Sequence, residues 1–269
     1  LHGAQRFTHG RERELRCGAR AHDQRERALR ARLRVRQVQR RRRVVLERLE
    51  PHIAHHADDA ARLAERRDAH ADRIAAVRPS SWARVAVDGA PAARPAELAD
   101  ALAVSLRLRG REVLRVSAAD FLRPASLRLE RGRDDPDVFY TDWLDSAGLT
   151  REVLGPLEPG GSGRVLPSLW DSAADRATRA AYVTLAERGV LLLDGALLLG
   201  RGLPLDHVVH LSMSPAALAR RAAPAERWTL PAYERYETEA APARAADTVV
   251  RVNDPRHPAL VEGADGRLA

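Results

Sequence analysis

The sequence predicts an α/β protein built on a doubly wound, parallel sheet of five strands. The first observation is that short apolar stretches typical of buried strands alternate with longer segments of helical periodicity. The second is that 45% of the 269 residues are hydrophobic, which is enough for a core of this size. The expected strands are 84–88, 112–117, 190–195, 207–211 and 248–252, and the expected helices are 97–109, 172–188, one from Pro215 and 231–239.

The first expected strand, 84–88, runs into a loop that has the frame of a phosphate-binding loop. Small residues follow Gly89, and a helical pattern then places Leu98, Leu102 and Leu106 on one face. The pattern G-x-x-x-x-G-K-[ST] would put a second glycine at 94, a lysine at 95 and a hydroxyl at 96. The candidate phosphate or nucleotide contacts in this frame are Asp88, Gly89, Ala90, Ala92, Ala93, Arg94 and Ala96.

Three residues of this frame lack the groups that the pattern supplies. Arg94 stands where a positive φ favours glycine, and Pro95 replaces a lysine ammonium and removes a backbone N–H. Ala96 lacks the hydroxyl that binds magnesium. All 45 basic residues of the chain are arginine, so no lysine elsewhere can substitute. The loop therefore keeps the strand–loop–helix pattern of a phosphate site but lacks the groups that bind phosphate and magnesium.

Two carboxylates follow neighbouring strands of the expected sheet. Asp120 comes after the strand 112–117, and Asp194 ends the uninterrupted apolar run at 190–195. The carboxyl ends of parallel strands meet at one edge of a sheet, where the loop after Gly89 also lies. An acid at the end of a buried strand commonly orients a metal-bound water. The alternative is that both acids only cap the ends of their strands.

The segment 125–188 separates two expected strands, and its stretch 125–170 is irregular and rich in aromatic residues. We interpret it as a lid or substrate-covering insertion, because so long a connection between core strands is usually functional. A glycine-rich linker with a small aromatic cluster is the equal alternative. Its last part, 172–188, is expected to be a helix that carries Arg176 and Arg179.

The N-terminal segment 1–58 differs in composition from the rest. Residues 1–80 contain 21 arginines against 11 acidic residues, whereas 81–269 contain 24 against 26. We interpret 1–58 as a disordered extension, or as an upstream segment translated from a misplaced start. Nucleic-acid binding is disfavoured, because no aromatic residue lies between Phe7 and Trp82. The folded domain is expected over 59–262, with a tail at 263–269.

Cysteine usage and hydropathy suggest a cytoplasmic protein. The single Cys17 cannot form an internal disulfide, which suits a reducing compartment. The chain has no apolar run of the roughly 18 residues that a membrane span needs, and no basic-then-apolar leader. We therefore expect no membrane association.

Several short motifs occur in the order found in one enzyme family. They are Val87-Asp88-Gly89, Asp120-Phe121-Leu122-Arg123-Pro124, Leu193-Asp194-Gly195, an arginine-bearing helix at 220–227, Tyr236, and Ala246-Asp247-Thr248-Val249-Val250. Through them the chain resembles, over about residues 63–258, the uridine kinase and phosphoribulokinase group of P-loop kinases.

This resemblance implies a P-loop NTPase fold of the kinase type and ATP-dependent phosphorylation of a hydroxyl on a nucleoside or similar small molecule. It implies ATP and Mg²⁺ as cofactors, with Asp120 as the general base and Asp194 holding the metal through water. It also implies phosphate contacts from Arg220 and Arg221. The implied substrate contacts are Phe121, Arg123, Tyr140, Trp143, Arg176 and Arg179.

The chain departs from the family at two places. The loop lacks the lysine and the hydroxyl, and the family motif Asp-x-Phe would need its acid at Ala119, whereas the acid here is Asp120. Two hypotheses therefore stand. The first is a uridine-kinase-like phosphotransferase in which Arg94 replaces the lysine charge. The second is a degenerate relative that binds nucleotide or phosphate without turnover.

Overall fold

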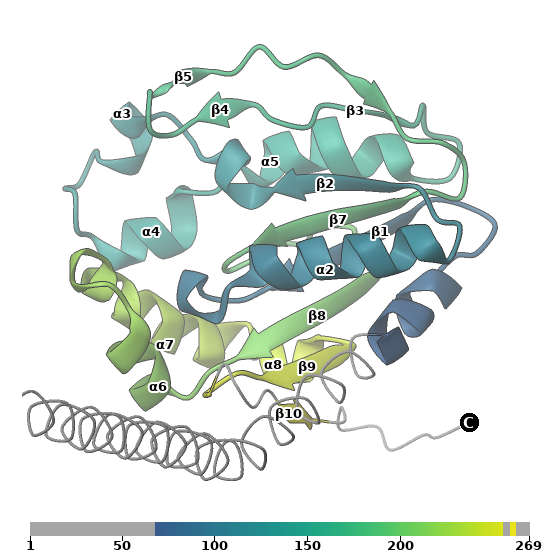
Figure 1. The fold of residues 1–269 in the computed structure, drawn as a ribbon. Helices are drawn as coiled ribbons and strands as arrows, with labels where there is room; N and C mark the ends of the chain where they lie inside the picture. Colours follow the sequence, from purple (N-terminus) through teal and green to yellow (C-terminus); the bar gives the residue numbers. More distant parts are fainter. Residues whose placement is uncertain (1–67, 255–258, 262–269) are drawn as a thin grey trace, which may run out of the picture. The chain divides into compact units, whose positions relative to one another are not determined.

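The computed structural model describes residues 68–254 and 259–261, and the expectations for 1–58 and 263–269 lie outside these residues. Its main sheet has the strand order β10-β9-β8-β1-β7-β2 (Figure 1). The five expected strands are β1 (Ala83–Asp88), β2 (Val113–Ser117), β7 (Val190–Gly195), β8 (His207–Ser212) and β9 (Thr248–Arg251). All five are parallel, with β1 central and β7 beside it, so the predicted sheet is confirmed.

The main sheet has one further strand that was not expected from the sequence. β10 (Ala259–Val261) pairs antiparallel with β9 at the edge of the sheet. Its apolar run is only three residues long, which is too short to distinguish a strand from a loop.

Helices cover both faces of the sheet, as the doubly wound prediction requires. Figure 1 shows α2 (Pro95–Leu108) lying along β1 and β7. Leu102 and Leu106 of α2 pack with Val85 and Val87 of β1 and with Ile74 from the helical residues 68–76. On the opposite face, a second cluster joins the alternate strand residues to the segment after β2: Ala86, Val116, Leu191, Leu193, Phe121, Leu149, Val153 and Leu154.

The segment between β2 and β7 is packed and mostly irregular. It contains α3 (Ala125–Arg128), α4 (Pro136–Asp142), α5 (Ser146–Leu149) and a π-helical turn at Thr150–Leu154. Phe139 and Trp143 lie edge-on to one another, with ring centroids 5.1 Å apart, and both contact Trp228 after α6. The aromatic residues of this segment therefore join it to the C-terminal helices.

The predicted helix at 172–188 is wrong. These residues are extended and include β5 (Arg176–Ala177) and β6 (Val183–Thr184), which pair with β4 (Trp170–Asp171) and β3 (Arg164–Val165) respectively. Most side chains between 173 and 184 are exposed, so the segment has no apolar face that a helix could bury. Asp171 instead accepts hydrogen bonds from two backbone N–H groups and fixes a turn.

The C-terminal part carries α6 (Pro215–Arg221), α7 (Leu230–Glu239) and α8 (Pro242–Ala245). The helices expected from Pro215 and at 231–239 are thus confirmed. Among the described residues, no helix has the length and apolar content that crossing a membrane requires.

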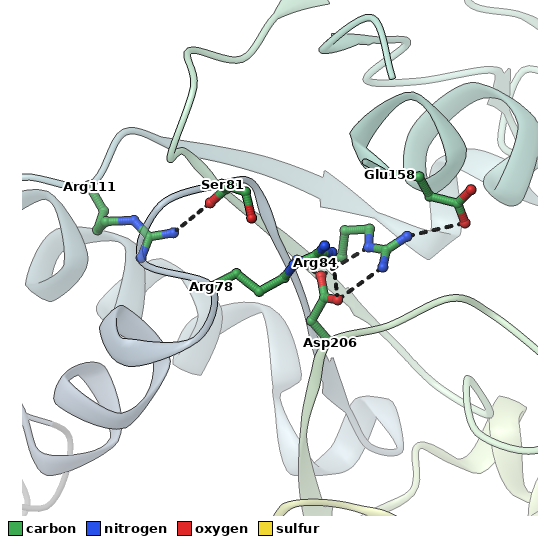
Figure 2. A network of polar contacts seen from close by, with 6 residues as sticks. All are labelled: Arg78, Ser81, Arg84, Arg111, Glu158 and Asp206. Carbon is green, nitrogen blue, oxygen red and sulfur yellow. Dashed lines mark hydrogen bonds and ion pairs between the residues drawn. The ribbon is translucent and has the colours of Figure 1, made fainter. Parts of the chain in front are cut away.

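An ion network around the buried Arg84 lies at the end of the sheet where β1 begins (Figure 2). Arg84 of β1 is 7% exposed, and its Nε and Nη2 lie 3.0 and 2.9 Å from the two carboxylate oxygens of Asp206. Arg78 binds Asp206 at 3.0 Å, and Glu158 lies 3.3 Å from Arg84. Asp206 directly precedes β8, so the network joins the starts of two neighbouring strands, β1 and β8.

Candidate functional site

The loop after β1 is closed by its own backbone hydrogen bonds. Pro91–Ala93 form one 3-10 turn, in which the N–H of Ala93 donates to Ala90 O at 2.8 Å and that of Arg94 to Pro91 O at 2.9 Å. A phosphate-binding loop directs such N–H groups at its anion. Two donors of this loop are therefore used internally.

Backbone conformation at the two ends of the loop agrees with the frame that the sequence predicts. A Cβ at Gly89 would lie 2.9 Å from Leu211 Cβ, so the loop enters too close to β8 for a side chain. Arg94 has φ +60°, the left-handed region where the pattern has glycine. This conformation costs a non-glycine residue about 1 kcal/mol. The Arg94 guanidinium is exposed and lies 3.4 Å from Glu97.

Asp194 lies at the end of β7 and is bound by its neighbours on β2. Arg115 Nη2 lies 2.6 Å from Asp194 Oδ1, and the Ser117 hydroxyl donates to Oδ2 at 3.2 Å. Arg115 also contacts Asp100 of α2 at 3.3 Å. Burial raises the pKa of Asp194, while Arg115 and Ser117 act in the opposite direction. The carboxylate is thus paired inside the protein.

These residues do not fit a Mg²⁺ ion. As a direct ligand the metal needs oxygen atoms in near-octahedral geometry, and Ala96 supplies none while the charge of Asp194 is already paired with Arg115 at 2.6 Å. Among the described residues, no group of three or more His, Cys, Asp or Glu side chains is arranged to hold a metal ion. The expected role of Asp194, which is to hold the metal through water, stays a prediction.

Asp120 is half-buried in the short turn after β2. Burial and the nearby carboxylates of Asp194 and Asp171 raise the pKa of Asp120 above its ordinary value. A carboxylate with a raised pKa near a cavity is a candidate general base. The predicted nearness of Asp120 and Asp194 at one sheet edge agrees with this effect of Asp194 on Asp120.

A cavity of about 440 Å³, here called the loop cavity, lies between the Gly89 loop and the segment after β2. Its wall is largely apolar and includes Leu122, Leu144 and Leu197. Its lining includes five residues that the sequence nominated: Gly89, Arg94, Ala96, Trp143 and Asp194.

Arg201 also lines the loop cavity and was missed by the sequence analysis. Its Nε donates to Leu197 O at 2.5 Å, its Nη2 donates to Tyr140 O, and its guanidinium lies 5.9 Å from the Tyr140 ring. The sequence signal that could have indicated Arg201 is its position shortly after β7. Nothing in the sequence distinguishes it from the other arginines.

Asp88 was nominated as a nucleotide contact, and the structure places it in the interior. The residue is fully buried, and its carboxylate accepts from Leu198 N at 3.0 Å, from Tyr236 Oη at 3.0 Å and from His210 Nδ1 at 2.7 Å. Its hydrogen bonds join β1 to β8 and α7. These three hydrogen bonds give the buried carboxylate a structural role in the core.

The other nominated residues lie outside the wall of the loop cavity. Phe121 and Ala93 are buried in the core, while Ala90 and Ala92 line a neighbouring cavity next to Trp228. Arg123 lies 3.6 Å from Asp142, and the Tyr140 ring lies 4.7 Å from the Arg235 guanidinium. Arg221 donates to Val252 O. Arg176, Arg179 and Arg220 are exposed.

Comparisons with known proteins found solved structures of similar fold. No family model matches the chain, and no curated protein matches it. The fold is similar to that of a possible uridine kinase from Bacillus stearothermophilus, with a TM-score of 0.58 and 20% identity over 70% of this chain and 98% of that chain. A candidate fructose transport system kinase from Silicibacter sp. TM1040 matches with a TM-score of 0.44 and 24% identity, over 66% and 89% of the two chains.

The first of these likenesses agrees with the architecture described above. A central parallel sheet of five strands, helices on both faces and a loop between β1 and α2 at the carboxyl edge are shared features of the kinase-type P-loop proteins. At 20% identity the likeness concerns the fold. The chain therefore has the α/β fold of P-loop kinases.

Proposed function

We propose that the protein binds a nucleotide or another small phosphate-bearing molecule in the loop cavity, without metal-dependent phosphoryl transfer. The observation that carries this proposal is the pairing of Asp194 with Arg115 at 2.6 Å, beside a loop that has no lysine and no hydroxyl. Phosphoryl transfer in this fold depends on positioning and charge neutralisation by those missing groups. The arrangement supports binding better than turnover.

Positive charge for a phosphate is available at this cavity. Arg94 and Arg201 line it, and α2, a helix of 14 residues, begins beside it at Pro95. The N–H groups of a helix's first turn have no partners within the helix and attract anions. Arginine also binds phosphate through paired N–H donors. The apolar wall suits the non-phosphate part of the ligand.

We predict that ATP binds with the same affinity, within about twofold, in the presence of Mg²⁺ and of EDTA, because Asp194 is already paired with Arg115. Isothermal titration of the full chain in both buffers measures this. In parallel, ADP release is measured with and without uridine, and none is expected. A large gain in affinity with Mg²⁺, or steady ADP formation with uridine, would contradict the proposal.

The raised pKa of Asp120 favours a second candidate, a uridine-kinase-like phosphotransferase. If ADP forms in that assay, Asp120→Asn is expected to lower the rate at saturating substrate by about 100-fold or more and to spare ATP binding. The rate of the parent should rise with pH through the raised pKa, because a base acts deprotonated. Asp134→Asn, in an exposed loop, is the control. Equal rates for all three proteins would remove Asp120 from the mechanism.

A further inference from the structure

A second cavity, here called the His210 cavity, lies on the other side of Gly89, between the end of β8 and the helices α6 and α7. Its volume is about 300 Å³ and its wall is mostly apolar, with Leu211, Leu218 and Leu230 among the residues that form it. No function proposed above uses this cavity.

His210 presents an unpartnered nitrogen in the wall of this cavity. The residue is 3% exposed, and its Nδ1 lies 2.7 Å from Asp88 Oδ2. Because an ionised carboxylate can only accept, Nδ1 donates this bond, and in the neutral ring Nε2 then carries the acceptor lone pair. Nε2 is buried and has no hydrogen-bond partner among the described residues. An unsatisfied buried acceptor indicates a missing donor.

The charges around the cavity are negative. Glu237 Oε1 lies 4.0 Å from His210 Nε2, and Glu234 also lines the cavity from α7. Asp88 contacts the other ring nitrogen of His210, Nδ1. None of the described lining residues is an arginine. Burial and the nearby Asp88 raise the pKa of Glu237, so a bound cation would favour the ionised form of this carboxylate.

We propose that the His210 cavity binds a small primary amine carried on an apolar or aromatic body. A single nitrogen can lie within hydrogen-bond distance of both Nε2 and Oε1, because these two acceptors are 4.0 Å apart. The protonated amine donates to His210 and pairs with Glu237. The apolar body packs against the leucines and Tyr233.

Isothermal titration of the full chain with phenethylamine and with 2-phenylethanol tests the proposal, since the two probes share shape and differ in the amine. Phenethylamine is expected to bind at least about tenfold more tightly. Glu237→Gln should remove this preference, whereas Glu239→Gln, on the same helix outside the cavity, should keep it. Ala219→Phe, which fills the cavity from α6, should weaken both probes.

Three results would overturn the proposal. They are equal affinity for the amine and the alcohol, a preference that survives Glu237→Gln, and unchanged binding in Ala219→Phe. Absence of phenethylamine binding at millimolar concentration would also overturn it. Thermal melts of each variant show that it is folded before titration. Because ATP is not a probe here, the result is independent of the function proposed for the loop cavity.

Discussion

Replacing Asp206 by asparagine is expected to lower the free energy of unfolding by about 3 kcal/mol, because it leaves the buried Arg84 without its anionic partner. Arg84 makes two hydrogen bonds to this carboxylate and is 7% exposed (Figure 2). Glu158 lies 3.3 Å away from Arg84 but is half-exposed, so it compensates weakly. The backbone N–H of Arg84 also donates to Asp206, and this bond can persist in the amide.

Urea unfolding of the parent and the variant measures this difference. Asp72→Asn is the matched control, because Asp72 forms an even shorter ion pair with Arg109, at 2.6 Å, but its side chain is 67% exposed. An exposed pair contributes at most about 1 kcal/mol. Equal losses in the two variants would show that burial does not decide the strength of the Arg84–Asp206 pair.

The same ion pair predicts a pH dependence. Burial acts to raise the pKa of Asp206, but the hydrogen bonds and charge of Arg84 outweigh it, and the folded-state pKa is lowered below the ordinary value of 3.8. A lowered pKa means that this stabilisation is fully present above the unfolded-state pKa and is lost as the pH falls through the folded-state pKa. The stability difference between the parent and Asp206→Asn should therefore shrink below about pH 4.

The core strands could be predicted because each contains apolar residues, in a run or in alternation, that the sheet buries. β1 and β7 have every residue but Gly195 buried, and the structure places both within one residue of the predicted bounds. The segment 172–188 could not be predicted in this way. Its two short strands, β5 and β6, are set by pairing with β4 and β3, and not by any local period.

The partners of the site residues depend on register, which the sequence does not show. Arg115 lies opposite Leu192 in the pairing of β2 with β7. Side chains two apart on a strand share a face, so this register brings Arg115 to Asp194. His210 reaches Asp88 in the same way, because β1 and β8 pair these two residues directly. The loop chemistry, in contrast, depends on the residue types at 94, 95 and 96 and needs no register; its loss stays a prediction.

Restoring the phosphate-binding pattern with Arg94→Gly, Pro95→Lys and Ala96→Thr is expected to tighten ATP binding by about 1.5 to 3 kcal/mol, which is roughly 10- to 100-fold. The glycine relieves the positive φ that Arg94 now adopts, and the lysine and threonine supply the ammonium and hydroxyl that the loop lacks. Titration in EDTA measures this gain, because no metal is needed for it.

Magnesium dependence should require a fourth change, Arg115→Gln. In the triple variant Asp194 is still bound by Arg115 at 2.6 Å, so affinity for ATP should stay equal in Mg²⁺ and EDTA. Removing the guanidinium frees one carboxylate oxygen beside the restored hydroxyl, and the four-residue variant should bind ATP more tightly in Mg²⁺. The triple variant with Arg133→Gln, an exposed arginine outside the site, is the control. If the triple variant alone became magnesium-dependent, Arg115 would not be what keeps Asp194 from the metal.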